Sequence, residues 1–455
     1  MRTRGFLLLA IVALGPVAAS MSAAQEAPRL HVGRELLGLF LAEKFDEFCA
    51  RGDEMMLEGF RPPRARITYQ TLQNRVGGFQ KSEGETLAIE GPNAVVKFRW
   101  RFDRGTVDGR VIVDSSNRLA GLWFDRMELL VPPPAYGDPS RFTEYAVTVG
   151  GPPLPLPGKI TIPNSAGPHP AVVLLHGSGP QDMEQSVGGV QMFRDLAWGL
   201  ASRGIIVLRF DKRTRAHPMA VKPEEWTPQN EVIDDARAAL ALLRSRPEVD
   251  AKRVFVVGHS LGAMLTPLVV KDEPSVAGAV MIAAPGRSVL DLLEEQTAYV
   301  AESDGEVSED DRRQREVIRE ACEKIRSGAP EQVVGLVLGQ PAGYWARLHA
   351  VHPLEIAATW ERPMLVLHAE RDYQVTRPDA AAWRDFAKAH PRVTWRELAG
   401  LNHLLVRGAG KSTPAEYRET ANVDESAVAA IADWILARRG AASPTSAPAT
   451  APATP

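Results

Sequence analysis

A serine stands between two glycines in the stretch Gly258–Gly262, which reads Gly-His-Ser-Leu-Gly. The apolar residues 253–257 before it predict a strand, and residues 262–270 after it predict a helix. The two glycines permit the cramped turn from strand to helix that raises the side chain of Ser260 above a sheet. The N-terminus of the helix also favours negative charge beside the serine. We therefore interpret Ser260 as a nucleophile rather than as part of an ordinary tight turn.

A second glycine-containing loop, His176-Gly177-Ser178-Gly179-Pro180, follows the apolar stretch 171–175, which predicts a buried strand. Glycines let backbone N–H groups approach a developing oxyanion, usually together with the amide of the residue after the nucleophile. The expected donors are the backbone amides of Ser178 and Leu261. A plain glycine turn is the alternative interpretation of this loop.

These loops can meet only if a sheet brings the ends of distant strands together. Apolar strands that alternate with helices imply a largely parallel sheet with helices on both faces, which is an α/β fold. The segments that give this pattern are strand candidates at 171–175, 205–210, 254–257, 279–282 and 364–367, and helix candidates at 191–202 and 232–244.

Residues 286–355 interrupt the alternation and form an insertion that contains an amphipathic helix at 309–326. We expect the insertion to lie over the mouth of the sheet as a lid, with a structural elaboration far from the site as the alternative. We interpret its aromatic residues Tyr344 and Trp345, and Trp360 after it, as core residues rather than as the lining of a pocket.

Residues 25–130 predict a small α+β domain that precedes the α/β domain. Its helix is expected at 31–50, where apolar residues recur at helical spacing, and its strands at 95–102, 107–113 and 119–124. A helix followed by an antiparallel meander resembles the small cone-shaped domains related to nuclear transport factor.

The start of the chain is typical of a signal peptide. Arg2 and Arg4 precede the apolar run 6–14, and small residues follow up to a cleavage site after Ala24. We expect residues 1–24 to be removed and the protein to be exported, periplasmic or extracellular, with an uncleaved anchor as the alternative. Charges interrupt every later apolar run, so no stable membrane span is expected after cleavage.

Two further segments are set apart by composition. Residues 131–140 begin Val-Pro-Pro-Pro and predict an extended linker, because consecutive prolines donate no backbone hydrogen bonds. The α/β domain then extends over residues 141–440. Residues 441–455 contain only Ala, Pro, Ser and Thr, which cannot form a core, so we expect a disordered tail.

The bulk composition excludes several classes of function. The 455 residues are 45% apolar and 24% charged, with a net charge of -3, so nothing indicates a nucleic-acid partner. The two cysteines, Cys49 and Cys322, each have apolar neighbours at helical spacing, and buried free thiols are expected rather than a disulfide. No metal-binding motif is present, and His349 and His352 lack nearby acidic ligands of suitable spacing.

Taken together, the motifs resemble the α/β-hydrolase superfamily, and in particular exported bacterial serine esterases that carry a small N-terminal domain. The resemblance extends to the dienelactone-hydrolase-like and serine-aminopeptidase-like branches and covers about residues 161–438. It rests on the His176–Pro180 loop, the Arg209–Arg213 segment, the Ser260 turn and the two loops that hold Asp372 and His403.

The resemblance implies that nucleophile, acid and histidine follow one another in the chain. His403, on a loop after the last predicted strand, is the expected base. The acid is expected after the strand at 364–367, where Glu370 and Asp372 are the candidates. Asp372 fits better because the family commonly places its acid three residues before an apolar residue, here Val375; Glu370 is the fallback and could instead be a surface partner of Arg371.

The resemblance also implies hydrolysis of short-chain carboxylic esters through an acyl-enzyme, with a small-molecule ester as substrate and no cofactor. Asp211 and Arg213 are interpreted as structural residues. A serine peptidase or an acyltransferase with the same triad is the nearest alternative, and a binding protein without catalysis is the alternative from another class. For residues 25–130 we expect a binding or dimerisation role, in which a homodimer is one arrangement.

Overall fold

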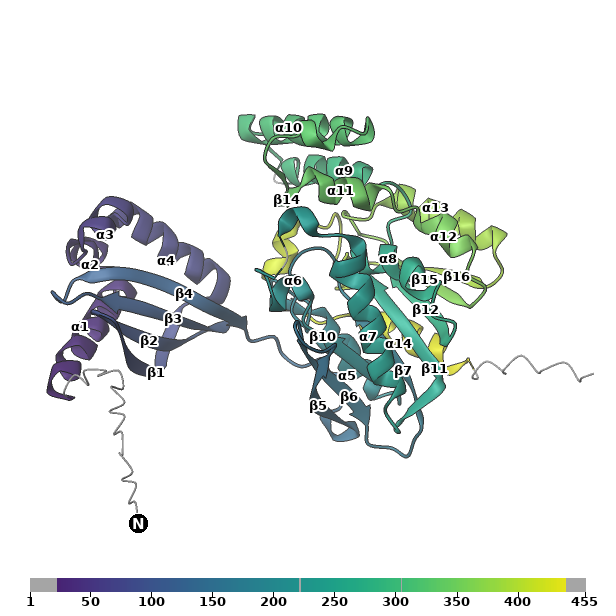
Figure 1. The fold of residues 1–455 in the computed structure, drawn as a ribbon, viewed down its shortest axis with the longest axis horizontal. Coiled ribbons are helices and arrows are strands. Elements are labelled where there is room, and N and C mark those ends of the chain that lie inside the picture. The colour runs from purple at the N-terminus through teal and green to yellow at the C-terminus, as the bar shows by residue number, and fades with distance from the viewer. Residues whose placement is uncertain (1–22, 221, 304, 439–455) are drawn as a thin grey trace, which may run out of the picture. The chain divides into compact units, whose positions relative to one another are not determined.

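The computed structural model describes residues 23–220, 222–303 and 305–438 (Figure 1). Apart from Ala23 and Ala24, the expected signal peptide and the expected tail at 441–455 lie outside these residues. The chain divides into two compact units between Leu130 and Val131, each with its own hydrophobic core. We refer to them as the N-terminal and C-terminal units.

The C-terminal unit is built on an eight-stranded sheet of order β16-β15-β12-β11-β7-β10-β6-β5. The six strands from β16 to β10 are parallel, whereas β6 and β5 are antiparallel to their neighbours. The predicted α/β class is therefore confirmed. The strands are β5 (Phe142–Val149), β6 (Leu156–Pro163), β7 (His169–Leu175), β10 (Ile206–Phe210), β11 (Val249–His259), β12 (Val276–Ile282), β15 (Met364–Ala369) and β16 (Val393–Leu398).

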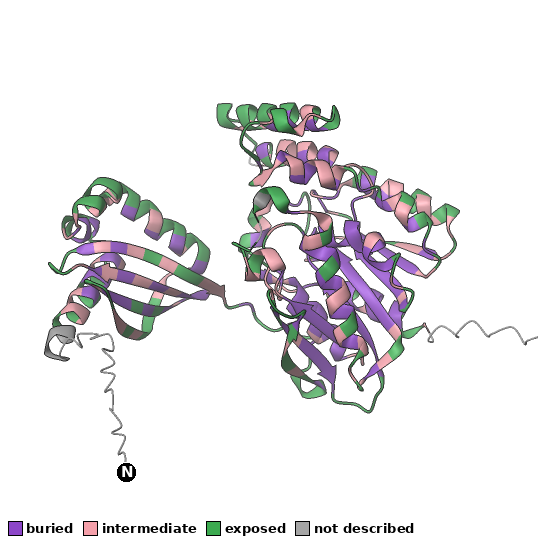
Figure 2. Ribbon diagram, viewed as in Figure 1, coloured by how far each residue is buried: buried purple, intermediate pink, exposed green. Residues whose placement is uncertain are grey.

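Helices cover both faces of this sheet, which is why its central strands are apolar at successive positions. In β7, Val172 and Leu174 belong to the core beneath α5 and α14, whereas Ala171 and Val173 belong to the core beneath α7, α8 and α13. Figure 2 shows these strands as buried. The covering helices are α5 (Met192–Ala201), α7 (Asp234–Arg244), α8 (Leu261–Val270), α13 (Arg377–Ala389) and α14 (Glu425–Leu436).

The hairpin of β5 and β6 has no counterpart among the strands expected from the sequence. In β5, at the edge of the sheet, the residues between Phe142 and Val149 are exposed or half-buried, so no apolar run marks the strand. The turn between the two strands is rich in glycine and proline and does not resemble a tight hairpin signal. Tertiary pairing with β10 therefore decides this part of the fold.

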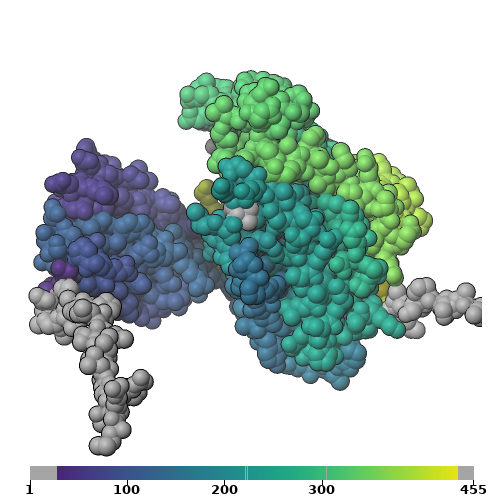
Figure 3. Space-filling model, viewed as in Figure 1, coloured from purple at the N-terminus to yellow at the C-terminus, as the bar shows by residue number. Residues whose placement is uncertain are grey.

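The insertion contributes helices α9 (Val289–Ala301), α10 (Glu309–Arg326) and α11 (Ala342–His349), a small hairpin, and the start of α12 (Pro353–Ala358). In Figure 3 its green residues gather at one end of the C-terminal unit. Helix α10 has the bounds expected from its apolar periodicity, and Ile318, Cys322 and Ile325 are buried against the rest of the insertion. The hairpin strands are β13 (Leu336–Val337) and β14 (Gln340–Pro341).

Short elements complete the C-terminal unit. They are β8 (Ser186–Val187), β9 (Val190–Gln191), α6 (Arg213–Ala216), the π-helix η3 (Gln229–Ile233), and the 3-10 turns η1 (Pro139–Arg141), η2 (Pro223–Glu225), η4 (Pro330–Gln332) and η5 (Pro414–Arg418).

The N-terminal unit packs helices on one face of an antiparallel sheet of order β1-β2-β3-β4. Its core joins Phe40 and Tyr69 of two helices to Phe98 and Trp100 of the sheet. The elements are α1 (Ala23–Leu41), α2 (Phe45–Ala50), α3 (Glu54–Gly59), α4 (Pro62–Val76), β1 (Phe79–Glu90), β2 (Asn93–Phe102), β3 (Gly105–Val113) and β4 (Leu119–Leu129).

The prediction of a single helix at 31–50 is wrong, because this part of the chain forms two helices, α1 and α2. Glu43 has a left-handed backbone with φ of 58°, which ends the first helix. The break lets Phe45 and Phe48 turn back onto Phe40, with ring centroids 5.8 and 5.4 Å away. Aromatic packing therefore overrides the continuous helical periodicity of the sequence.

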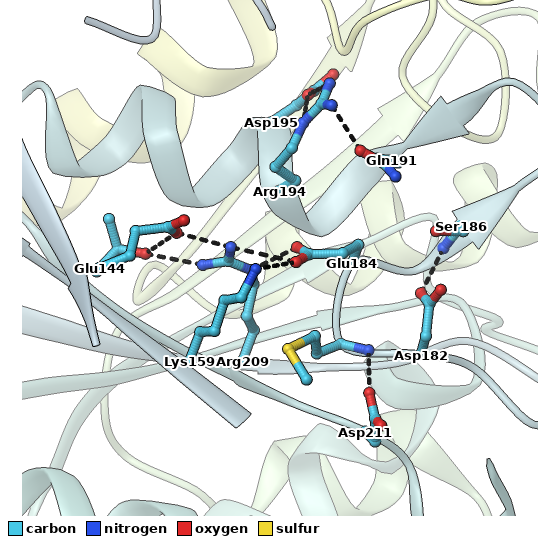
Figure 4. Close-up of polar contacts among 12 residues, drawn as sticks. Glu144, Lys159, Asp182, Glu184, Ser186, Gln191, Arg194, Asp195, Arg209 and Asp211 are labelled. Atoms are coloured by element: carbon cyan, nitrogen blue, oxygen red, sulfur yellow. Dashed lines mark hydrogen bonds and ion pairs between the residues drawn. The ribbon is translucent and has the colours of Figure 1, made fainter. Parts of the chain in front are cut away.

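The segment expected to be a linker is bound along the C-terminal unit. The buried guanidinium of Arg194 donates hydrogen bonds to the carbonyl oxygens of Val131 and Pro132, each at 2.8 Å. The neighbouring Asp195 accepts from the guanidinium and, on its other oxygen, from the Val423 amide at 3.0 Å. Figure 4 shows Arg194 and Asp195 side by side.

Cys49 and Cys322 are both buried and unpaired, as expected. Within residues 23–220, 222–303 and 305–438, no helix combines the length and the apolar character needed to cross a membrane.

A fully buried arginine ties the antiparallel hairpin to the rest of the sheet. Arg209 of β10 donates to Glu144 and Glu184, each at 2.7 Å, and to Thr161 at 2.8 Å (Figure 4). Burial would raise the pKa of Glu184, but the charges of Arg209 and Lys159 hold that pKa below its usual value. All these charges are therefore paired.

We expect Arg209→Met to lower the free energy of unfolding by about 3–5 kcal/mol, because it leaves the half-buried carboxylate of Glu144 without its partner and leaves Glu184 with Lys159 alone. Urea denaturation followed by circular dichroism measures this change. Arg237→Met is the matched control, since its partner Asp272 is exposed and the pair should contribute no more than about 1 kcal/mol. Equal losses in the two variants would contradict the expectation.

Candidate active site

Ser260 lies in the turn between β11 and α8, in a backbone conformation that non-glycine residues rarely adopt, with φ of 53° and ψ of -118°. The flanking glycines make this turn possible. A Cβ atom on Gly258 would lie 2.4 Å from the Thr266 hydroxyl oxygen, and one on Gly262 would lie 2.3 Å from the Leu175 carbonyl oxygen. The sequence motif therefore reflects close approach of three backbone segments.

His403 and Asp372 are in direct contact. The Nδ1 atom of His403 lies 2.7 Å from Oδ2 of Asp372, and both side chains are buried. The other carboxylate oxygen accepts from the amides of Gln374 and Val375 at 2.8 and 2.9 Å. Burial would raise the pKa of Asp372, but His403 and the Val375 amide hold it below its usual value. The ionised carboxylate keeps the proton of His403 on Nδ1 and leaves Nε2 free to act as a base.

The fallback acid, Glu370, does not take part in this contact. Its carboxylate accepts from the amide of Gly400 at 2.8 Å. Nor is it the partner of Arg371, which pairs with Glu416 instead. The interpretation of Glu370 as a surface partner of Arg371 is therefore wrong; its carboxylate fixes the start of the loop that leads to His403.

Two backbone amides next to Ser260 have no acceptor among the described residues, namely those of Leu261 and Ser178. The Leu261 amide opens helix α8, where N–H groups have no partner within the helix. The loop of Ser178 lies beside the serine, because a Cβ on Gly177 would be 3.4 Å from Cβ of Ser260. Two unpaired donors at one place are what an oxyanion requires.

Ser260 and His403 line one cavity of about 370 Å³, together with Ser178 and Leu261. The insertion supplies much of its apolar wall, so it does lie over the sheet end that holds the serine. The wall residues from the insertion are Val289, Leu292, Leu293, Gln296, Leu338, Gln340, Tyr344 and Trp345.

Tyr344 and Trp345 correct an expectation, because they line this cavity as well as being buried. Trp360, in contrast, lies in the core under the sheet, as expected. The sequence holds no signal for the difference, since buried aromatics in a core and in a pocket wall follow the same periodicity. Among the described residues that line the cavity, none is Asp, Glu, Lys or Arg.

Asp211 and Arg213 make contacts that fit the structural role expected for them. Asp211 accepts from the amide of Met183 at 2.8 Å, and Arg213 pairs with Asp235. Within the part of the chain that the structure describes, no three His, Cys, Asp or Glu side chains are grouped so that they could hold a metal ion.

Comparisons with known proteins agree with this architecture. A family model described as the alpha/beta hydrolase family matches residues 172–420. Esterase EstD of Thermotoga maritima is 38% identical over 387 residues, which cover 82% of this chain and 89% of that protein.

Two solved structures illustrate more distant similarity. Est1E from Butyrivibrio proteoclasticus is 14% identical, with a TM-score of 0.42, over 64% of this chain and 99% of that one. A puromycin-hydrolysing peptidase of Mycobacterium tuberculosis is 18% identical, with a TM-score of 0.43, over 78% of this chain. The match spans 47% of the length of that peptidase.

Proposed function

The chain belongs to the alpha/beta hydrolase family, and on that basis we propose that it hydrolyses carboxylic esters with Ser260 as the nucleophile. The relative that matches most of the chain is named an esterase, which supports ester hydrolysis over other reactions of this fold. The observation that carries the proposal is the buried hydrogen bond between His403 and Asp372, at the wall of the cavity that Ser260 also lines.

In the proposed reaction, Nε2 of His403 takes the proton of the Ser260 hydroxyl as its oxygen attacks the ester carbonyl. Asp372 stabilises the imidazolium that forms. The amides of Leu261 and Ser178 bind the negative oxygen of the tetrahedral intermediate. His403 then protonates the leaving alcohol, and a water molecule releases the acid from the acyl-enzyme by the same steps.

The cavity favours a small and uncharged ester. Its volume of about 370 Å³ lies near the lower end of the range of small-molecule sites, which is roughly 300–1,000 Å³. Its apolar wall suits a short acyl chain. A peptidase that grips a free amine needs a carboxylate in the pocket, and the described lining residues include none, so we favour an esterase over a peptidase.

One prediction concerns two of the three proposed catalytic side chains, Ser260 and Asp372. With p-nitrophenyl acetate or butyrate, Ser260→Ala should lose about 10⁶-fold in kcat. Asp372→Asn should lose about 10⁴-fold, because the amide favours the wrong tautomer of His403. Glu370→Gln is the matched control and should stay within about twofold, since the carboxamide oxygen of Gln can still accept from the Gly400 amide.

Labelling by a fluorophosphonate separates catalysis from mere binding, because only an activated serine reacts. The wild-type protein should be labelled at Ser260 and the Ser260→Ala variant should not. Turnover of both esters by Ser260→Ala at the wild-type rate would remove the serine from its role.

Another prediction concerns the charge of the acyl group in the substrate. A p-nitrophenyl hemisuccinate carries a carboxylate where p-nitrophenyl butyrate carries a methyl group. We expect kcat/KM for the charged ester to be lower by about 100-fold or more, because the cavity would have to take up an unpaired charge. The rates of alkaline hydrolysis correct for intrinsic reactivity, and equal corrected values would contradict an uncharged substrate.

We also propose that the protein is exported after cleavage behind Ala24, on the basis of the N-terminal sequence. Expression of the full chain in a bacterium, followed by mass spectrometry of the periplasmic fraction, should give a mature protein that starts at Gln25. Leu8→Asp breaks the apolar run and should keep the chain uncleaved in the cytoplasm. Periplasmic protein that still starts at Met1 would argue for an anchor instead.

A further inference from the structure

The loop that carries the Ser178 amide depends on side chains for its position. Gly177 lies beyond the end of β7 and is buried. Its N–H donates to Oε1 of Gln185 at 2.9 Å, and its carbonyl oxygen accepts from Nζ of Lys212 at 3.1 Å. The two backbone groups of one residue are therefore held from opposite sides by two buried side chains.

The peptide unit between Gly177 and Ser178 makes these contacts relevant to catalysis. This peptide is trans, so its carbonyl and its N–H point in opposite directions. A side chain that fixes the Gly177 carbonyl therefore fixes the direction of the Ser178 N–H. A cation at the carbonyl end also polarises the peptide and strengthens the N–H as a donor.

Gln185 connects this loop to the rest of the site. It is 1% exposed and has a left-handed backbone with φ of 46°. Its Nε2 donates to Nδ1 of His259 at 2.8 Å, while Nε2 of His259 lies 2.9 Å from the carbonyl oxygen of His403. Because a carbonyl can only accept, Nε2 of His259 carries the proton and Nδ1 is the acceptor.

Protonation does not disturb this chain of hydrogen bonds near neutral pH. Burial, and then the proximity of His403, lower the pKa of His259 to about 3. The ring therefore stays neutral, and the carboxamide of Gln185 has one favoured orientation. Three hydrogen bonds join the loops of Gly177, Ser260 and His403.

On the other side, Lys212 is part of a buried ionic chain that reaches the insertion. Its Nζ lies 2.6 Å from Oε1 of Glu231, and the two side chains are 3% and 4% exposed. The hydroxyl of Tyr344 donates to the other oxygen of Glu231 at 2.8 Å. A buried ion pair is an expensive way to stabilise a fold, because desolvation offsets most of the attraction. Lys212 of this ion pair also contacts the Gly177 carbonyl, so the pair can position the Gly177–Ser178 peptide as well as stabilise the fold.

We propose that Lys212 and Gln185 are positioning residues that aim the Ser178 amide at the oxyanion, with Glu231 fixing Lys212. This inference rests on the proposed esterase function. Neither side chain needs to touch the substrate: Lys212 acts through the carbonyl of the Gly177–Ser178 peptide, and Gln185 acts through the N–H of the preceding His176–Gly177 peptide.

The test uses two variants of the full chain. Lys212→Met with Glu231→Gln removes both charges at once and leaves an acceptor for Tyr344. Gln185→Met keeps the length of the side chain and removes its hydrogen bonds to Gly177, His259 and the sulfur of Met192. Each should lower kcat by about 10–100-fold with little change in KM, since loss of an entire oxyanion donor costs about 10²–10³-fold.

A pair of inhibitors separates positioning from general damage. An alkyl trifluoromethyl ketone adds to the Ser260 oxygen, and the carbonyl oxygen becomes the anion of a tetrahedral adduct. The matched methyl ketone binds without forming that adduct in comparable amount. The affinity of the trifluoromethyl ketone should fall by about the same factor as kcat, whereas that of the methyl ketone should stay within about threefold.

Two control variants make equivalent changes nearby. Arg213→Met with Asp235→Asn removes an adjacent ion pair that does not contact Gly177, and Gln191→Met replaces a glutamine that bonds to Arg194. Both should keep kcat within about twofold.

Unchanged kcat in the two test variants, or equal losses of affinity for both ketones, would overturn the inference. The variants act on the two peptides that flank Gly177, so a folding defect in either variant leaves the other to decide. If instead the wild-type protein fails to hydrolyse esters, the proposed function itself has failed.

Discussion

Parallel pairing of the strands sets the level at which every loop of the site leaves the sheet. Gly258 pairs with Leu175, His259 pairs with Ile282, and Ala369 pairs with Leu398. Because parallel strands end at the same edge, Leu175 and Leu398 reach that edge although they are 223 positions apart in the chain (398 minus 175). The chemistry assigned to Ser260, Asp372 and His403 depends on this register, since none of these side chains is useful without the other two.

Charge is distributed around the cavity in a consistent way. The wall that a substrate would meet contains apolar side chains, side-chain amides, hydroxyl groups and two histidines, but no Asp, Glu, Lys or Arg among the described residues. Asp372 and the pair of Lys212 with Glu231 do not line the cavity; Asp372 contacts His403, and Lys212 contacts the Gly177 carbonyl. In a dry environment such fixed dipoles stabilise a transient anion more strongly than mobile water could.

The sequence was most informative where the chemistry is local. The two glycines around Ser260 report backbone contacts within one turn, and the apolar strands report burial on both faces of the sheet. The choice of Asp372 over Glu370 followed from the family pattern, and the structure gives the physical difference, because only Asp372 contacts His403.

Contacts between residues far apart in the chain could not be predicted from the sequence. Tyr344 and Trp345 line the cavity only because of the path that the insertion takes, and the break near Glu43 depends on aromatic rings that meet after folding. The roles of Lys212 and Gln185 could not be read from the sequence, since their partners are the backbone carbonyl and N–H of Gly177, which leave no trace in the residue types.

The sheet and the insertion supply different parts of the cavity, which matters for attempts to change the substrate preference. The reactive groups come from the sheet edge, whereas the insertion helices α9 and α11 and the hairpin between them supply most of the apolar wall. Acyl-chain preference can therefore be redesigned as a module, by randomising Leu292, Leu293 and Leu338, while the catalytic apparatus is left intact. A library of variants at those three positions would change which acyl chains are preferred and leave the proposed catalytic residues unchanged.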